Sequence, residues 1–218
     1  MRRPTIAPTI ATTAEMTAAP VSIAGFDIGR PPLRAAPFAH ILVDRCLDAQ
    51  AEAALLAWFE QDAPWRLVET DFYEQYEFSL LHVVLPPAVA RLFQAPAMDA
   101  LHRQMAETFG VAMTARLNAV AHKLIPGQRI AIHNDYLVGE ETHRLTVQLN
   151  RGLADEDGGL FMLFNSFDPA DIHSLHRPVS ATGVGFAIGP DSHHAVSRMH
   201  SGTRFTIVFS FYAEPAGS

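Results

Sequence analysis

The stretch R-F-T-I-V-F-S-F-Y, residues 204–212, alternates between two kinds of side chain. Every second position, from Phe205 to Phe211, is aromatic or aliphatic, while the positions between them begin with Arg204 and Thr206. Because successive side chains of a β-strand point to opposite faces, this period of two predicts a strand with one apolar face and one partly polar face.

Two further stretches repeat the pattern. In R-L-T-V-Q-L-N, residues 144–150, leucine and valine alternate with polar side chains, which are Arg144, Thr146, Gln148 and Asn150. In R-I-A-I-H-N-D, residues 129–135, His133 and Asp135 share one face of a predicted strand. The polar faces either meet water or line a polar cavity inside a β unit. The cavity is favoured, because the predicted helices need the apolar faces to pack against.

Two helices are predicted before the strands, at 48–60 and 97–109. Asp48 is a suitable N-cap for the first, and Gly110 a natural end for the second. F-A-H-I-L-V, residues 38–43, resembles a short strand. After residue 110 the chain contains short segments rich in Val, Ile, Phe and Thr, at 114–125, 129–135, 143–150, 159–164, 183–188 and 203–213.

This order predicts a mainly β protein of about eight strands with flanking helices, built as a sandwich or small barrel. We expect one domain over residues 31–218, with helical support at about 45–110 and a β core at about 113–213. Residues 1–30 are expected to be a disordered or loosely ordered tail, although a transit peptide also fits its composition.

Composition excludes several classes of function. The formal charge of −7 argues against general nucleic-acid binding. No apolar run approaches the roughly 20 residues that span a membrane. Cys46 is the only cysteine, so the chain has no intramolecular disulfide and no cysteine-based zinc site, and we expect a cytoplasmic protein. The sequence does not indicate the oligomeric state.

His133 and Asp135 are candidate metal ligands. Two histidines and one carboxylate can hold iron and leave positions open for other ligands. A third ligand must come from another strand, and the candidates are His173, His176, His193, His194 and His200. Surface or satisfied core positions are expected for His40, His82, His102, His122, His143 and, among the candidates, His200.

Arg204 is the second chemical signal. It begins a strand of apolar and hydroxyl side chains, and no Asp or Glu occurs from residue 192 to 213 to pair with it. A buried guanidinium is costly without a partner. A small dianionic molecule would provide one, because arginine holds carboxylates in a fixed bidentate geometry.

Taken together, H-N-D, S-H-H-A-V and G-T-R-F-T resemble the H-x-D, H and R-x-S/T motifs of Fe(II)/2-oxoglutarate-dependent dioxygenases, in the prolyl-4-hydroxylase-like branch. The resemblance covers roughly 117–213 and implies a double-stranded β-helix, or jelly-roll, core. It implies His133, Asp135 and His194 as iron ligands, with His193 as the alternative to His194.

The resemblance also implies the contacts of 2-oxoglutarate. Arg204 would pair with its distal carboxylate, and Thr206 and Gln148 would support it. Members of the family often have a tyrosine where this chain has Leu124, which leaves the contacts of that strand open, and Lys123 is a weak candidate there.

The implied activity uses Fe(II), 2-oxoglutarate and oxygen to hydroxylate an unactivated C–H bond. A small molecule, such as an amino acid or a natural-product intermediate, is the expected substrate, and a peptide or carrier-bound substrate is the alternative. Segments 70–82 and 163–176 are expected to face the pocket, with Phe72, Tyr73 and Tyr76 as a lid or as ordinary packing. A non-enzymatic jelly-roll binding module and a cupin-type metal enzyme independent of 2-oxoglutarate remain as rivals.

Overall fold

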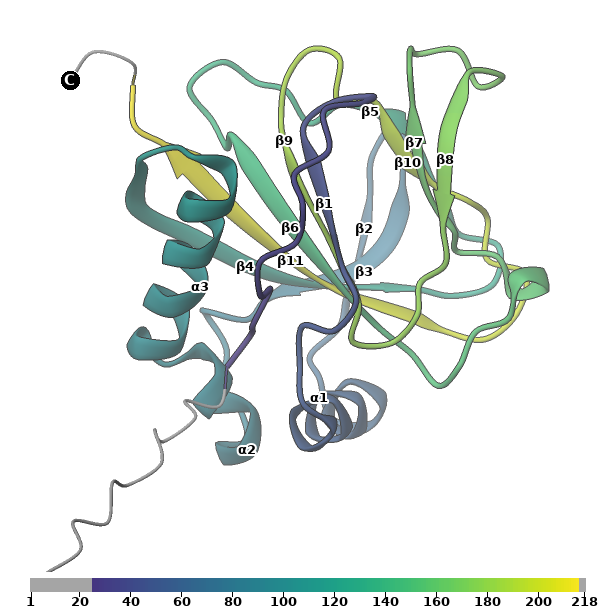
Figure 1. The fold of residues 1–218 in the computed structure, drawn as a ribbon. Coiled ribbons are helices and arrows are strands. Elements are labelled where there is room, and N and C mark those ends of the chain that lie inside the picture. The colour runs from purple at the N-terminus through teal and green to yellow at the C-terminus, as the bar shows by residue number, and fades with distance from the viewer. Residues whose placement is uncertain (1–24, 216–218) are drawn as a thin grey trace, which may run out of the picture.

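The computed structural model describes residues 25–215, which form two facing antiparallel sheets with helices on one side (Figure 1). The seven-stranded major sheet has the order β1-β9-β6-β11-β4-β3-β2, and the four-stranded minor sheet has the order β5-β10-β7-β8. The strands are β1 (His40–Val43), β2 (Arg66–Glu69), β3 (Glu74–Ser79), β4 (Met113–Leu124), β5 (Ile130–His133), β6 (His143–Leu149), β7 (Phe161–Phe164), β8 (Ile172–His176), β9 (Gly183–Ala187), β10 (His194–Val196) and β11 (Arg204–Ala213). The arrangement confirms the predicted mainly β fold with a jelly-roll core.

The helices are α1 (Ala49–Gln61), α2 (Pro87–Ala90) and α3 (Ala95–Phe109), with short 3-10 turns at Arg91–Phe93 and Asp155–Asp157. Asp48 caps α1 by accepting a hydrogen bond at Oδ1 from the amide of Ala51 (2.7 Å). Gly110 ends α3 with a left-handed φ of 65°. The start of α1 and the end of α3 therefore agree with the prediction from the sequence.

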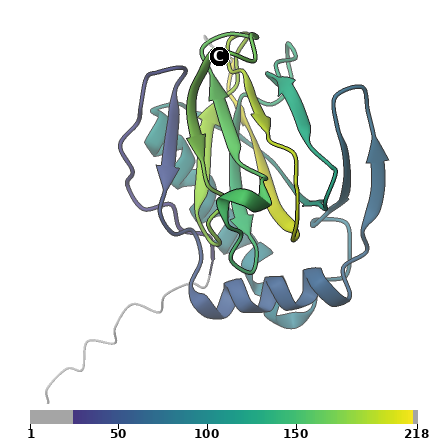
Figure 2. The same ribbon diagram turned by 90° about the vertical axis from the view of Figure 1, so that its right-hand side faces the viewer.

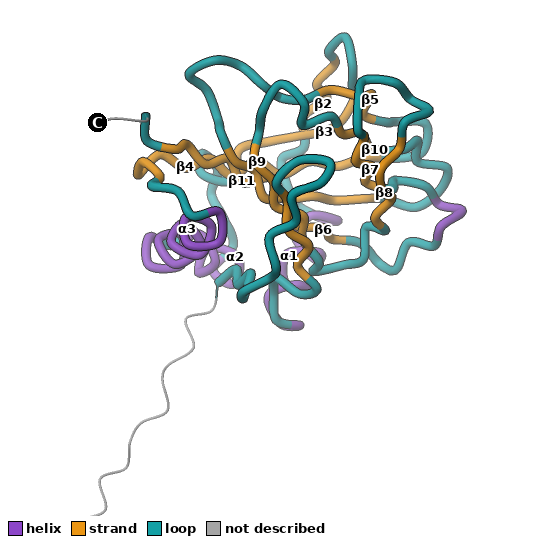
Figure 3. The backbone as a smooth tube through the Cα atoms, turned by 45° about the horizontal axis from the view of Figure 1, so that its top comes forward, coloured by secondary structure: helices purple, strands orange, loops and turns teal. Residues whose placement is uncertain are grey.

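The helices cover the outer face of the major sheet, and the minor sheet lies across its inner face (Figure 3). The main core contains the alternate apolar residues of β6 and β11 together with buried residues of α1 and α3, including Leu145, Phe209, Phe59 and Leu101. The polar faces of β6 and β11 therefore turn inward between the sheets, as the cavity interpretation required. A smaller core that includes Phe161 and Phe186 lies between the two sheets.

Three features differ from expectation. Phe26 and Ile28 are 2% and 3% exposed and belong to the main core, so the packed unit begins before the predicted boundary at residue 31. Residues 1–24 of the predicted tail lie outside the described residues. The β2–β3 hairpin extends the major sheet where no strand was predicted, and β8 is an edge strand of the minor sheet, also where no strand was predicted (Figure 2).

Within residues 25–215, no helix combines the length and the apolar character needed to cross a bilayer.

Candidate metal centre

His133, Asp135 and His194 meet at one edge of the cavity between the sheets. His133 ends β5 and His194 begins β10, and the two residues are direct partners in the antiparallel pairing. Their candidate ligand atoms and a carboxylate oxygen of Asp135 all lie within 4.8 Å of one another. The Nε2 atoms of His133 and His194 are 3.4 Å and 3.1 Å from the two oxygens of Asp135. The three side chains thus form a compact set that could hold one metal ion.

The sequence predicted that Asp135 lies on the same strand as His133, and the structure shows that it does not. β5 ends at His133, and Asp135 adopts a left-handed backbone with φ 57°. This conformation is uncommon for a residue other than glycine and is often found at functional sites. Here it turns the carboxylate back toward the two imidazoles.

Backbone carbonyl groups fix the tautomer of both histidines. Nδ1 of His133 lies 2.9 Å from the carbonyl oxygen of Ala131, and Nδ1 of His194 lies 2.8 Å from that of Ser192. Because a carbonyl can only accept, each Nδ1 must carry the hydrogen, and each Nε2 lone pair is free. Metal-ligating histidines are held in the same way, so the donor set fits a divalent transition metal.

Charge at the three residues also suits a metal. Burial lowers the pKa of His194 despite its contact with Asp135, which favours the neutral ring that a metal needs. Burial alone would raise the pKa of Asp135. Its contacts with His133 and His194 and the nearby Arg144 outweigh burial and hold that pKa well below its ordinary value. The site therefore presents a neutral ring at His194 and a carboxylate at Asp135.

The other candidate histidines lie elsewhere. His193 is outside the cluster: its ring is 5.7 Å from that of Phe167, and its buried Nδ1 has no hydrogen-bond partner among the described residues. His173 and His176 are on β8, and His200 is exposed. His122, expected at the surface or in the core, instead lines the cavity, where burial lowers its pKa to about 3.

The cavity has a volume of about 280 Å³ and is lined by strands of both sheets. Arg204 lies in its wall and is 3% exposed. Its side chain makes no ion pair or hydrogen bond with residues 25–215, and its Nε atom is buried without a partner. Burial lowers its pKa to about 10. Arg204 is a buried cation that faces the cavity and has no acidic partner. An anionic ligand in the cavity would supply that partner.

Of the other predicted cofactor contacts, Thr206 lines the metal cavity, whereas Gln148 and Lys123 do not. Thr206 lines the cavity beside Arg204, and its hydroxyl donates to Gln148 Oε1 (3.3 Å). Gln148 Nε2 donates to Thr146 Oγ1 (3.2 Å), and Gln148 itself lines a different cavity at the edge of β9. Gln148 therefore reaches the metal cavity through Thr206. Lys123 lies on the opposite face of the sheet, 5.0 Å from the ring of Tyr76, so neither residue faces the cavity.

Arg144 is a site residue for which no role was predicted. Its guanidinium pairs with Asp135 (2.5 Å) and with Glu141. Burial alone would lower its pKa, but the two carboxylates outweigh burial and raise it. Alternation had placed Arg144 on the cavity face, but only the fold brings it to the carboxylate of Asp135.

The β2–β3 hairpin closes one side of the cavity. The amide of Ala131 in β5 donates to the carbonyl of Phe72 (2.9 Å), and the Phe72 ring lies 4.8 Å from that of His133. Tyr73, Gln75 and Glu77 also line the cavity. Segment 70–82 thus faces the site as expected, whereas no residue of 163–176 lines this cavity.

A glycine turn makes room for Arg204. Gly159 has a φ of 69°, and a Cβ atom on it would lie 2.5 Å from Met199 Sδ and 3.0 Å from Arg204 Cδ. The D-E-D-G-G turn therefore allows the arginine side chain to pass close to the backbone.

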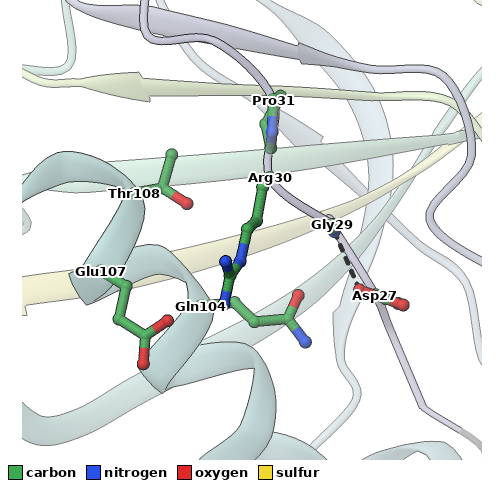
Figure 4. A pocket seen from close by; sticks show the side chains of 7 residues that line it. All are labelled: Asp27, Gly29, Arg30, Pro31, Gln104, Glu107 and Thr108. Carbon is green, nitrogen blue, oxygen red and sulfur yellow. Dashed lines mark hydrogen bonds between the residues drawn. The ribbon is translucent and has the colours of Figure 1, made fainter.

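A larger depression of about 550 Å³ lies between residues 27–31 and α3 (Figure 4). It is lined by Arg30, Gln104, Glu107 and Thr108, among others, and Gln104 Oε1 accepts from the amide of Ile28 (2.8 Å). It is lined by no histidine, and the cluster of candidate metal ligands found among the described residues lies in the smaller cavity instead.

The fold is shared with solved structures of 2-oxoglutarate and iron(II) oxygenases, among them prolyl hydroxylases. No family model and no curated protein matches the chain in sequence. A prolyl-4-hydroxylase from Pseudomonas putida is similar in structure, with a TM-score of 0.65 and 15% identity over 81% of this chain and 93% of that chain.

Two further solved structures share this fold. A 2OG-Fe(II) oxygenase family oxidoreductase from Burkholderia pseudomallei has a TM-score of 0.56 and 15% identity over 79% of this chain and 85% of that chain. A prolyl hydroxylase from Trichoplax adhaerens, in complex with a peptide fragment of the hypoxia inducible factor oxygen degradation domain, has a TM-score of 0.67 and 11% identity over 80% of this chain and 83% of that chain.

Proposed function

We propose that the chain is an Fe(II)/2-oxoglutarate-dependent dioxygenase that hydroxylates an unactivated C–H bond of a small molecule, such as an amino acid or a natural-product intermediate. The observation that carries the proposal is the buried, unpaired Arg204 in the same cavity as His133, Asp135 and His194. One ligand that chelates a metal at one end and carries a carboxylate at the other would satisfy both features.

Each residue has a defined part in this function. His133, Asp135 and His194 would hold iron(II) on one side and leave its other positions open. Arg204 would pair with the far carboxylate of 2-oxoglutarate, and Thr206 would support it. When bound, iron, 2-oxoglutarate and oxygen supply the oxidising chemistry, with succinate and carbon dioxide as co-products. The two sheets and the β2–β3 hairpin limit the access of water.

Anaerobic titration with Fe(II) and then 2-oxoglutarate tests this function. A weak visible charge-transfer band should appear only when both are present. It should be absent in Asp135→Ala and His133→Ala. A folded protein that shows no band contradicts the proposal and favours the binding-module or cupin interpretation.

Arg204→Ala separates 2-oxoglutarate binding from metal binding. Removing one partner of a buried charge pair costs about 2–5 kcal/mol, so the Kd for 2-oxoglutarate should rise by roughly thirtyfold or more. Affinity for the metal should persist, and Arg204→Lys should retain part of the 2-oxoglutarate affinity. An unchanged Kd in Arg204→Ala would remove this residue from the site.

A peptide substrate is the second candidate. Three exposed apolar residues directly follow Asp135, namely Tyr136, Leu137 and Val138, at 43%, 68% and 87% exposure. Such a rim beside a cavity suits a larger partner, and the Trichoplax adhaerens structure contains a peptide. Succinate release measured against parallel panels of small molecules and peptides distinguishes the two classes.

A further inference from the structure

Glu77 places a carboxylate in the wall of the metal cavity without a cation to balance it. Its side chain is 27% exposed and accepts a hydrogen bond from Gln75 Nε2 (3.0 Å). The basic group in contact with this carboxylate is the ring of His122, whose Nε2 atom lies 3.8 Å from Glu77 Oε2. Burial lowers the pKa of His122 to about 3, so this ring is neutral at neutral pH. Within residues 25–215, no lysine or arginine pairs with Glu77.

The other charges of the cavity balance one another once the proposed cofactors are bound. Iron(II) and Arg204 together would match the negative charges of Asp135 and 2-oxoglutarate. Arg144 then remains paired with Glu141, which lies beside it at the rim. Glu77 is the charge left over, and a partly buried carboxylate favours a cationic partner.

Gln75 adds a second acceptor on the same face of β3. It is 1% exposed, and its Oε1 atom has no hydrogen-bond partner among the described residues. The orientation of the amide is fixed, because Nε2 donates to Glu77. An unsatisfied buried acceptor beside an unbalanced carboxylate calls for a ligand that carries several N–H donors and a positive charge.

We propose that Glu77 and Gln75 bind a cationic amine group of the substrate. This inference rests on the proposed function, because the proposed iron site defines where the substrate reacts. It narrows the substrate class to amines. Phe72, Tyr73 and Ile130 line the same cavity and would contact the apolar part of the amine. Aromatic rings also attract cations. The cavity volume of about 280 Å³ suits a short aliphatic amine, either free or as the side chain of a peptide.

Isothermal titration calorimetry of the full chain loaded with Zn(II) and 2-oxoglutarate tests the proposal without turnover. The probes are n-butylammonium, 1-butanol and butyrate, which share a chain length and differ in charge. We expect the ammonium to bind about tenfold or more tightly than the other two. An N- and C-capped tripeptide with a central lysine then tells whether a peptide-borne amine is accepted in place of the free one.

Glu77→Gln should abolish the preference for ammonium while retaining the hydrogen bond to Gln75. The matched control is Glu69→Gln, which removes an exposed carboxylate from β2 of the same hairpin and should keep the preference. Gln75→Leu, which leaves the charge in place, should weaken ammonium binding several-fold. It serves as a second test if Glu77→Gln fails to fold.

Equal binding of the three probes, tighter binding of butyrate, or an ammonium preference that survives in Glu77→Gln would each overturn the proposal. Loading is measured first, so a protein that takes up neither Zn(II) nor 2-oxoglutarate contradicts the proposed function instead. n-Butylammonium and 1-butanol are then titrated into the metal-free protein, in which Glu77 still lacks a cation; butyrate is left out, because Arg204 is then free to bind its carboxylate. The outcome there decides the amine site independently.

Discussion

The two histidine rings of the candidate metal centre are oriented by carbonyl groups two residues earlier in the chain, at Ala131 and Ser192. Each ring therefore has its Nε2 atom turned to the side on which the carboxylate of Asp135 lies before any metal arrives. Preorganisation of this kind reduces the free energy that binding must spend on ordering side chains. The left-handed backbone at Asp135 serves the same purpose.

The adjacent pair His193 and His194 gives a sharp test at the scale of single residues. His194→Ala should weaken metal binding by at least about 100-fold, because disturbing a hydrogen bond to a ligand already costs roughly 10- to 100-fold. His193→Ala should leave affinity nearly unchanged, because His193 lies outside the cluster. Anaerobic Co(II) titration, followed by visible absorption, measures both. The reverse result would move the ligand assignment by one residue.

The sequence brought forward His133 and Asp135 through their spacing and Arg204 through its unpaired charge, whereas His194 was selected from five histidines by the motif resemblance alone. It could not identify Glu77 or Gln75. These residues reach the cavity only because β3 pairs with β4, which lies far along the chain. Pairing partners of that kind are set by tertiary packing and leave no local signal.

At the scale of elements, the turn before β7 positions Arg204. Gly159→Ala should destabilise the protein by more than the roughly 1–2 kcal/mol of a left-handed alanine, because the new Cβ would also meet Met199 and Arg204. It should also weaken 2-oxoglutarate binding by displacing the guanidinium. Thermal denaturation and ligand titration measure the two effects.

Gly152→Ala is the matched control for this turn. Gly152 also has a positive φ, of 89°, but a Cβ there would meet nothing within 4 Å. The variant should therefore lose stability from backbone strain alone and keep its affinity for 2-oxoglutarate. Equal affinity for 2-oxoglutarate in Gly159→Ala and Gly152→Ala would show that a Cβ atom at residue 159 does not displace Arg204.

The contact between α3 and β6 predicts sensitivity to acid. His143 packs its ring 4.8 Å from that of Phe109, and burial lowers its pKa from 6.5 to about 4. Between these values the unfolded chain binds a proton that the folded chain does not. The free energy of unfolding should therefore fall as the pH decreases from about 6.5 to about 4, by up to about 3 kcal/mol from this residue.

Urea denaturation across this pH range measures the effect. His143→Gln should flatten the pH profile, whereas His82→Gln, which removes an exposed histidine, should leave the profile as it is. Identical profiles for His143→Gln and the unaltered protein would exclude His143 as the source of acid sensitivity.

Elements with a strong apolar period were predictable, and those without it were not. α1 and α3 and the long strands β4, β6 and β11 have such a period and were placed correctly. β8 has the sequence I-H-S-L-H with mostly exposed side chains, and β10 has only three residues. Strands this short or this exposed are held by their neighbours, so their own sequences do not identify them.

At the scale of the whole molecule, the two sheets are unequal. The major sheet shares the main core with the helices, whereas the minor sheet relies on short strands and a smaller core. His133 and His194 belong to two of these short strands, so a metal bound there would link β5 to β10.

Hydrogen exchange should reveal this asymmetry. In the metal-free protein, amides of β10 should exchange faster than those at the centre of β11. Free metal at about a hundred times its Kd should slow amide exchange in β10 by roughly 100-fold. The reason is that β10 can then open only when the metal dissociates, and the metal-free form is correspondingly rare. Equal exchange in β10 and β11 without metal would show that the minor sheet does not open separately.

The link between β5 and β10 has a consequence for turnover of the protein itself. A protease cuts a chain where the chain opens, and here the opening strands carry two of the three metal ligands. Metal-free molecules should be cut in the minor sheet well before metal-loaded molecules. The lifetime of the protein, and with it the amount present, should then follow the supply of metal.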